Sequence, residues 1–341
     1  MKKLLCKIAA ICLAAIILLC GCTESKIEEN AVLDAAVTAA RAQKNLFGAE
    51  ESENLLSLTE KFSAGVSLCD WTAVSFKELG ISDDYDFYLE SLEAYVTEKY
   101  ASEGKLDSSK ATEWHRIIMT ATALGADATA FGTNPDGTKI NLVADGIYNY
   151  VNGDLGAQGI NGYIYALLAL DCGKYEVPKN SRYTRESIVA AIIAEQHEDG
   201  SFGFGKRSDI DITAMALHAL APYTDDRSIK AVLDAGIEFL SNEQNGDGTF
   251  SGIDEKTSES TSQVIIALCA NGIDPRTDER FIRHKTSVYD ALFDFQQKDG
   301  SFSHRIDEEK GDILATNQAM AAFLALANFE NGKSGAFIFY D

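Results

Sequence analysis

Apolar residues recur along the chain in runs at helical spacing, and one turn sequence separates these runs three times. The turn reads Gln, two variable residues, Asp, Gly, Ser or Thr, and Phe, and it covers residues 196–202, 244–250 and 296–302. Each copy follows an amphipathic run and precedes, after a polar loop, a run rich in small apolar residues. The repeating unit is therefore a pair of helices about fifty residues long, a period typical of closed rings and solenoids.

Weaker copies extend this repeat toward the N-terminus and make six units. Nearly uncharged, alanine-rich runs predict an inner layer of helices at 70–79, 115–124, 161–170, 211–220, 261–268 and 316–323. Amphipathic runs with charges between the apolar positions predict an outer layer at 50–62, 84–101, 139–151, 184–196, 227–243 and 286–297. Six such pairs close a ring that needs no capping repeats. We therefore expect an all-α fold, an α/α6 toroid.

The repeated turn indicates structural chemistry. Its Gly supplies a positive φ, its Asp and Ser or Thr bond nearby backbone amides, and its Phe inserts into the wall of the ring. Its Gln ends the outer helix, where the amide is placed to bond carbonyls of the helix end and of the neighbouring unit. We predict scaffold roles for these residues.

The first residues are expected to lie outside the fold. A lysine-rich start precedes an apolar stretch over residues 8–19, the pattern of a secretory signal peptide. The sequence Leu-Cys-Gly-Cys over 19–22 resembles the bacterial lipobox, in which cleavage before Cys22 leaves that thiol to be acylated. An uncleaved single-span anchor is the alternative. We predict a signal peptide over 1–21, a tether over 22–30 and one toroid domain over 31–341, lipid-anchored outside the bacterial cell membrane.

The net charge of −22 at pH 7 restricts the partners, because a surface of that sign repels nucleic acid. We therefore exclude DNA and RNA. Beyond Cys22, the predicted mature chain has only Cys69, Cys172 and Cys269, each in or beside an inner apolar run, where cysteine is typically a small buried hydrophobe. Three thiols cannot all pair, so we expect no disulfide framework. We expect a monomer without cofactor or metal.

A family resemblance follows from one copy of the repeat. Residues 236–250 resemble the QW motif of squalene and oxidosqualene cyclases, with Phe250 in place of the usual Trp. This resemblance implies the superfamily of α/α toroids, which also includes protein prenyltransferase β subunits, intrinsic factor and transcobalamin, and thioester domains of complement-type proteins. It is firm over 184–326 and weak over 50–183. It specifies the fold more than the function, because the superfamily spans enzymes and carriers.

The candidate site is the rim where the inner helices begin. Parallel inner helices gather their N-termini at one end of the ring, where backbone amides carry partial positive charge. Capping explains many polar residues there, but it requires neither the tryptophans and histidine nor two nearby aspartates. We predict a ligand-binding rim of Asp70, Trp71, Glu113, Trp114, His115, Asn161, Asp209, Asp211, Glu259, Thr316 and Asn317. Acidic loops at 253–259 and 307–312 are expected to overhang it, which favours a cationic or hydrogen-bond-donating ligand group, or calcium.

An enzymatic alternative rests on residues 209–214, which are similar to the Asp-x-Asp-Asp-Thr-Ala signature of class II terpene cyclases. The resemblance implies that Asp211 is the catalytic acid of a squalene-hopene cyclase-like enzyme and Asp209 its neighbour. Ile212 replaces the third Asp, although protonating an alkene requires a carboxylic acid held by close partners. Those cyclases also use two helical barrels, and this chain has residues for one.

Other branches of the superfamily match less of the sequence. Zinc prenyltransfer uses an Asp-x-Cys pair where Asp209 and Asp211 stand. His304 lies in a nearby loop, where an isolated histidine is typically solvated. The Cys-Gly-Glu-Gln segment of thioester domains does not occur. The cobalamin carriers resemble this chain in the helix start over 211–216, but they close over the corrinoid with a β-rich domain for which we expect no counterpart here.

These observations predict a cell-surface lipoprotein that binds a corrinoid-like or isoprenoid-like small molecule, or a protein, at the polar rim. A cyclase-like enzyme using Asp211 is one alternative, and a structural or protein-interaction module is another. The central cavity distinguishes the first two. A cyclase needs a deep apolar tunnel lined by aromatic residues near Asp211, whereas a surface carrier needs a broad shallow one.

Overall fold

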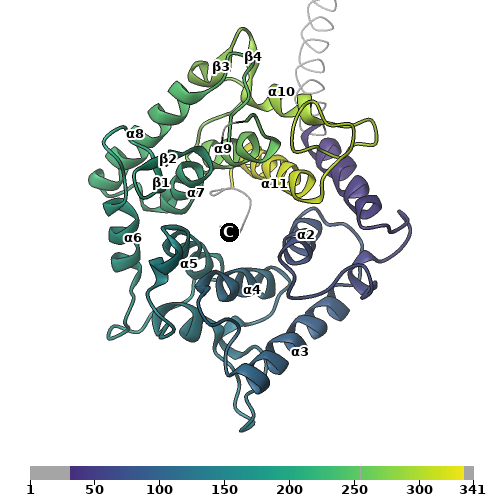
Figure 1. Cartoon of the computed structure of the whole chain (residues 1–341), viewed down its shortest axis with the longest axis vertical. Coiled ribbons are helices and arrows are strands. Elements are labelled where there is room, and N and C mark those ends of the chain that lie inside the picture. Colours follow the sequence, from purple (N-terminus) through teal and green to yellow (C-terminus); the bar gives the residue numbers. More distant parts are fainter. Residues whose placement is uncertain (1–30, 254, 334–341) are drawn as a thin grey trace, which may run out of the picture.

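The alanine-rich runs form six inner helices, because small side chains let neighbouring helices approach closely around a ring (Figure 1). The structure is a computed structural model that describes residues 31–253 and 255–333. Each inner helix packs against the next, and the last packs against the first, which closes the ring. The inner helices are α2 (Ser67–Glu78), α4 (Ala111–Ala123), α5 (Asn161–Cys172), α7 (Ile210–Leu220), α9 (Ser258–Ala270) and α11 (Ile313–Glu330). The predicted α/α6 toroid is confirmed.

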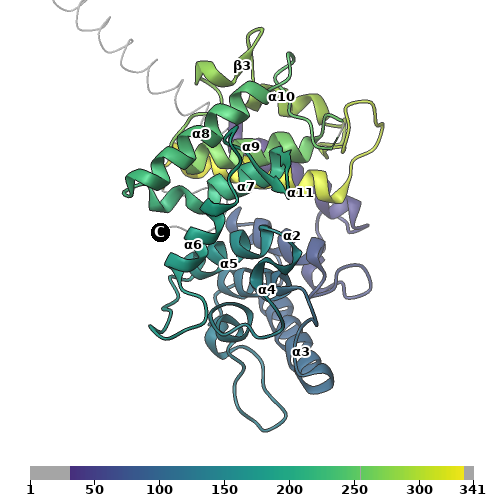
Figure 2. The same ribbon diagram turned by 60° about the vertical axis from the view of Figure 1, so that its left-hand side comes forward.

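The outer layer is less regular than the sequence predicts. Figures 1 and 2 show that its elements surround the inner helices, with α2, α4 and α5 in one half of the ring and α7, α9 and α11 in the other. The outer elements are a helix over 31–46, α3 (Tyr85–Glu103), the short π-helix η3 (Ala144–Tyr148), α6 (Arg185–Ala194), α8 (Arg227–Glu243), and α10 (Val288–Leu292) with its continuation η7 (Phe293–Phe295).

One outer helix was predicted in the wrong place. Residues 50–62 contain only the 3₁₀ turn η1 (Leu55–Ser57), and residues 31–46 take the first outer position instead. The amide of Gln43 bonds the hydroxyl of Thr72 in α2 at 3.0 Å and the carbonyl of Ile313 in α11 at 3.1 Å. The N-terminal helix thus joins the first inner helix to the last at the point where the ring closes.

The remaining elements are short. Two hairpins precede helices of the second half of the ring, and the first pairs Phe202 with Asp209. The hairpin strands are β1 (Phe202–Phe204) with β2 (Arg207–Asp209), and β3 (Ile282–Arg283) with β4 (Thr286–Ser287). The other 3₁₀ turns are η2 (Ala128–Ala130), η4 (Leu155–Gln158), η5 (Ala221–Tyr223) and η6 (Glu279–Phe281).

The repeated turn joins each unit to the next outer helix. The amide of Gln196 donates to the carbonyl of Gly200 in its own turn and, at 2.8 Å, to the carbonyl of Val232 in α8. Gln244 repeats this pattern with Gly248 and Phe281. The phenylalanines of the three turns are fully buried. Gln196 and Gln244 thus each bond both their own turn and the next unit, so the turn is part of the scaffold.

The cysteines and the helix lengths complete the comparison with the sequence. Cys69, Cys172 and Cys269 are free thiols, and burial raises the pKa of each above its ordinary value. In the described part of the chain, none of the helices combines the length and the apolar character that crossing a bilayer requires. The predicted signal peptide, Cys22 and the tether lie outside the described residues.

Candidate functional site: the central cavity and its rim

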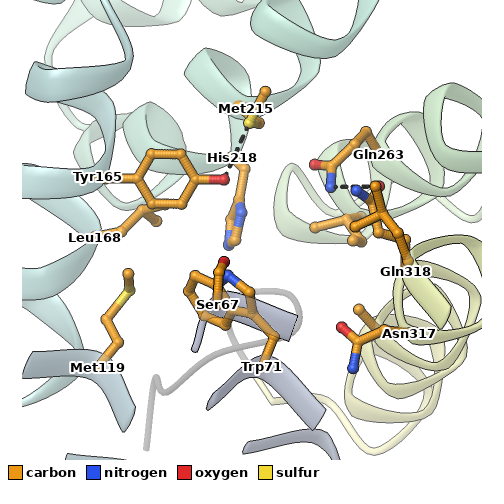
Figure 3. Close-up of a pocket in the computed structure, with 13 residues that line it drawn as sticks. Ser67, Trp71, Met119, Tyr165, Leu168, Met215, His218, Gln263, Asn317 and Gln318 are labelled. Carbon is orange, nitrogen blue, oxygen red and sulfur yellow. Dashed lines mark hydrogen bonds between the residues drawn. The ribbon is translucent and has the colours of Figure 1, made fainter. Parts of the chain in front are cut away.

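A cavity of about 230 Å³ lies inside the ring, and every inner helix contributes to its wall (Figure 3). Of the predicted site residues, only Trp71 and Asn317 are among those that line it. The lining residues are Ser67 and Trp71 of α2, Met119 of α4, Tyr165 and Leu168 of α5, Met215 and His218 of α7, Gln263 and Ile266 of α9, and Leu314, Asn317, Gln318 and Ala321 of α11.

The lining residues follow each other along the helices at spacings of three and four, so each helix presents one stripe to the cavity. Four predicted rim residues, His115, Asn161, Asp211 and Glu259, stand four positions before Met119, Tyr165, Met215 and Gln263 respectively. The predicted rim therefore lies one helical turn before the cavity wall. Extending the predicted rim by one helical turn would have found these lining residues.

The cavity wall combines flat, flexible and polar side chains. The rings of Trp71 and Tyr165 belong to helices that are not neighbours, and they meet across the ring with centroids 6.3 Å apart. Met119 and Met215 add thioether side chains that adapt to irregular ligands. The cavity is neither the aromatic tunnel expected of a cyclase nor a broad shallow face.

Two polar contacts inside the wall are already made. The amide of Gln263 donates to the amide oxygen of Gln318 at 3.1 Å, which links α9 to α11. The amide of Asn317 donates to Thr72 at 3.3 Å, which links α11 to α2. These bonds fix the orientation of the polar side of the cavity.

His218 is the buried ionisable group of the cavity. It is 5% exposed, and burial lowers the pKa of its imidazole to about 4, so the ring is neutral at pH 7. Its Nε2 atom has no hydrogen-bond partner in the described part of the chain. The sequence does not predict this residue as part of the site, because a histidine on an apolar helix face belongs to no motif.

At the rim, Asp211 lies on the first turn of α7 beside acidic neighbours. Burial raises the pKa of its carboxyl to about 6, the hydroxyl of Ser260 opposes this shift, and Asp209 and Glu259 add to it. Its Oδ1 atom has no hydrogen-bond partner among the described residues. Asp209 caps α7 by accepting a bond from the amide of Ile212 at 2.9 Å. The structure thus brings three predicted residues together on α7 and α9.

His304 joins this cluster, although the sequence indicated a solvated loop residue. Its Nδ1 atom lies 3.0 Å from the carboxylate of Glu259, and its Nε2 atom lies 3.3 Å from that of Glu255. Burial lowers the pKa of His304, but the two carboxylates outweigh burial and raise it. The loops around 255 and 304 therefore meet over the rim.

On the other side of the ring, Asp70 and Glu113 are tied together by Arg116. The guanidinium bonds Asp70 at 2.8 Å and Glu113 at 2.9 Å. Asp70 is fully buried and also accepts bonds from the hydroxyl of Tyr88 at 2.6 Å and the amide of Gly65 at 3.0 Å. Burial raises the pKa of Asp70. This carboxylate therefore bonds protein groups rather than facing the mouth.

Three other predicted residues bond the wall of the ring. The indole of Trp114 donates to Tyr100 at 2.9 Å, and Nε2 of His115 lies 3.0 Å from the carbonyl of Gly146 in the outer layer. The hydroxyl of Thr316 bonds the backbone of Phe302. Asn161 begins α5, and its Oδ1 atom has no hydrogen-bond partner among the described residues. Of the predicted rim, Trp71 and Asn317 thus line the cavity, and Asp211 stands one helical turn before the lining residue Met215.

No metal site is evident among the residues that the structure describes. They contain no group of three or more His, Cys, Asp or Glu side chains that could hold a metal ion. The calcium alternative for the rim therefore finds no set of ligands in that part of the chain.

Comparison with known proteins places the chain among toroid proteins. The family described as prenyltransferase alpha-alpha toroid domain matches residues 87–281 and 158–338. No curated protein sequence matches the chain significantly.

Solved structures share this fold at low sequence identity. Protein geranylgeranyltransferase-I of Candida albicans, complexed with GGPP, is 13% identical with a TM-score of 0.55, over 86% of this chain and 91% of that one. The type II terpene cyclase MstE from Scytonema is 12% identical with a TM-score of 0.54, over 88% and 99%. The ent-copalyl diphosphate synthase from Streptomyces platensis is 20% identical with a TM-score of 0.50, over 76% of this chain and 50% of that one. These likenesses show the toroid fold.

Proposed function

The chain belongs to the prenyltransferase alpha-alpha toroid domain family, and from that premise we propose that it is a binding protein that holds a small isoprenoid-like ligand in the central cavity. The observation that carries the proposal is the cavity itself, to which all six inner helices contribute. An apolar cavity of about 150 Å³ takes up benzene. A space of about 230 Å³ therefore suits a ligand larger than a single ring.

The wall supports a branched apolar ligand. Trp71 and Tyr165 offer flat faces, and the methionines adapt to methyl branches. Two structural neighbours bind isoprenoid compounds, GGPP in the transferase and geranylgeranyl dihydroxybenzoate, the substrate, in MstE. A corrinoid is larger than the drug-sized ligands that fill pockets of about 300–1,000 Å³. The cavity therefore favours the isoprenoid over the corrinoid hypothesis.

Titration with farnesol, followed by the fluorescence of Trp71, tests the proposal. The chain has two tryptophans: Trp71 lines the cavity, and Trp114 is buried in the wall. We expect farnesol to change the emission and Ala321→Phe to abolish this change, because the added ring fills the cavity. Ala94→Phe adds the same ring to the exposed face of α3 and is expected to bind normally. Equal binding of farnesol by Ala321→Phe and Ala94→Phe would show that the ligand does not bind in the cavity.

We propose that the acidic rim of Asp209, Asp211 and Glu259 contacts the ligand at the mouth. Asp211→Asn keeps the shape of the side chain and removes its charge. Loss of farnesol binding at an unchanged Tm would support a ligand contact. Equal binding by this variant and the wild type would remove Asp211 from the site.

We also propose that the protein is a lipoprotein outside the bacterial cell membrane, attached through Cys22. The sequence before Cys22 supports this proposal, because it combines a basic start, an apolar stretch and the lipobox-like residues. Cys22→Ala is expected to abolish membrane retention, since acyl chains on one thiol carry the attachment. Unchanged fractionation of that variant with membranes would refute lipidation.

A second candidate function is acid-catalysed cyclisation by Asp211. The observation that favours it is the buried carboxyl with a raised pKa and an unpaired Oδ1 atom. Ile212 in place of the third Asp, and the position of Asp211 outside the cavity wall, count against it. Incubation with geranylgeranyl substrates and mass spectrometry of the products tests it. Cyclised product from the wild type but not from Asp211→Asn would establish the enzyme.

A further inference from the structure

The central cavity contains a buried polar atom that no group of the described residues satisfies, and we infer that this atom, Nε2 of His218, recognises a hydroxyl group on an otherwise apolar, uncharged ligand. This inference rests on the proposed function and narrows it to a ligand class. An isoprenoid alcohol fits the class, and an isoprenoid diphosphate does not.

The His218 side chain is buried and faces the cavity. The side chain is 95% buried, lines the cavity and has no hydrogen bond at Nε2 within the described residues. Figure 3 shows its imidazole extending into the space between Tyr165 on one side and Gln263 and Gln318 on the other. An unsatisfied buried polar atom costs folding free energy, whereas a leucine there would cost none. A ligand group that bonds Nε2 would offset that cost.

The protonation state selects the ligand group. Burial lowers the pKa of His218 to about 4, so the imidazole is neutral at pH 7 and each nitrogen either donates or accepts a hydrogen bond. A hydroxyl group both donates and accepts, so it complements Nε2 in either tautomer. A carboxylate or phosphate oxygen only accepts, and it would need the protonated ring for a strong bond.

The charges around the cavity exclude a diphosphate. Among the described residues that line the cavity, none is Lys, Arg, Asp or Glu. At the rim, Asp211 and Glu259 stand one helical turn before the lining residues Met215 and Gln263. A diphosphate needs cationic partners, and it would instead meet a neutral wall with two carboxylates one helical turn away.

Apart from His218 and Ser67, the polar side chains that line the cavity already bond protein groups. The amides of Gln263 and Asn317 donate to Gln318 and Thr72. The hydroxyl of Tyr165 lies 3.3 Å from the sulfur of Met215. Because these bonds hold neighbouring helices together, using them for a ligand would loosen the ring.

Binding of three probes with one carbon skeleton tests the inference. Geraniol carries a hydroxyl, myrcene carries no polar group, and geranyl diphosphate carries the anion. From the fluorescence of Trp71, we expect the wild type to bind geraniol roughly fivefold more tightly than myrcene, the ratio for one net hydrogen bond, and geranyl diphosphate most weakly. His218→Leu is expected to bind geraniol and myrcene equally and to melt at a higher Tm without ligand.

Two further variants control for packing. Met215→Leu changes the shape of the same stripe of α7 without touching a hydrogen-bonding nitrogen, and it is expected to keep the preference for geraniol. His218→Gln offers a neutral amide in place of the imidazole and is expected to restore part of the preference if His218→Leu folds poorly.

The outcomes separate the inference from the proposed function. Equal binding of geraniol and myrcene by the wild type, or a preference that survives in His218→Leu, would overturn the role of His218 while the cavity remains a binding site. Tightest binding of geranyl diphosphate would overturn the neutral ligand class. Binding of no probe, together with no effect of Ala321→Phe on farnesol, would end both proposals.

Discussion

The half of the ring built from α7, α9 and α11 connects its layers through backbone turns, whereas the half built from α2 and α4 uses buried side-chain networks. In the first half, glycines 200, 248 and 300 approach Ala235, Ala291 and Thr38 of the next outer helices. In the second half, Arg116 joins Asp70 to Glu113, and Tyr100 joins Trp114 to Asp145. The glycine turns of the first half recur as a repeated motif, so they can be recognised in the sequence. The side-chain networks of the second half follow no sequence pattern, and their stability depends on buried charges that must stay paired.

The largest effect is expected when the buried ion pair is broken. Arg116→Met leaves the fully buried Asp70 without its cationic partner, which costs about 3–5 kcal/mol of the free energy of unfolding. Urea denaturation measures the loss. Lys139→Met removes a pair with Glu93 in which both side chains are about half exposed, and it is expected to cost less than about 1 kcal/mol.

The double variant Asp70→Asn with Arg116→Met should recover most of the loss, because no fully buried charge is left unpaired and Glu113, the other partner of Arg116, is partly exposed to solvent. If Arg116→Met lowers the free energy of unfolding no more than Lys139→Met does, the buried charge network does not stabilise the half of the ring built from α2 and α4.

The next effect concerns the backbone turns. Gly200 has φ +89°, and an added Cβ would lie 2.5 Å from the carbonyl oxygen of Ala235. Gly200→Ala is therefore expected to cost about 3 kcal/mol from the left-handed backbone and the clash together. Gly205 has φ +61°, and a Cβ added there would meet open space. Gly205→Ala is therefore expected to lower the free energy of unfolding by only about 1 kcal/mol. Equal melting temperatures of the two variants would show that the close approach to α8 does not matter.

A smaller effect is expected from the hydroxyl that holds the phenylalanine of the turn. Thr213 accepts a bond from the amide of Phe202 at 2.9 Å and donates to the carbonyl of Asp209 at 2.6 Å, and Thr261 accepts from the amide of Phe250 at 3.1 Å. Thr213→Val keeps the volume and orphans these buried groups, which costs about 2 kcal/mol. Thr261→Val should cost a similar amount in thermal denaturation. A loss confined to one of them would contradict the equivalence of the units.

The smallest effect is expected at the rim, as a pH dependence. The pKa of Asp211 is raised to about 6 in the folded state, whereas that of an unfolded aspartate is about 4. The folded state therefore binds the proton more tightly. This contribution to the free energy of unfolding is fully present below about pH 4 and is lost as the pH rises through about 6. Relative to Asp211→Asn, the wild type should lose about 1 kcal/mol between pH 4 and pH 7, since solvent screens a partly open rim. Asp209→Asn keeps the cap but removes a charge that raises the pKa of Asp211, so its loss over the same pH range should be smaller. Parallel stability curves for the wild type and Asp211→Asn would contradict the raised pKa.

The sequence predicted the inner layer better than the outer layer. Alanine-rich runs stay helical in any arrangement that buries them, so all six inner helices were found. The region 50–62 looked amphipathic, but the helix over 31–46 takes the outer position because Gln43 bonds both ends of the ring there. That contact joins residues far apart in the chain, and no local pattern predicts it.

The candidate site likewise contains some residues that the sequence predicted and others that it did not. Asp209, Asp211 and Glu259 were found at the rim because helix starts favour acidic residues. The sequence indicates a solvated residue at His304, because the carboxylates that it contacts, Glu255 in the preceding loop and Glu259 in α9, are far away in the chain. His218 and Tyr165 were missed, because facing a cavity depends on how six helices pack rather than on residue type.

By itself, the sequence determined the helical repeat, the closed ring and the chemistry of the turns, because each depends on periodicity and on the conformational preferences of a few neighbouring residues. The tertiary structure alone decided which polar residues are paired and which face open space. Asp70 and Asp211 occupy similar places at the starts of inner helices. Arg116 pairs with the first, and no atom of the described chain bonds Oδ1 of the second. That difference depends on which distant side chains the closed ring brings together.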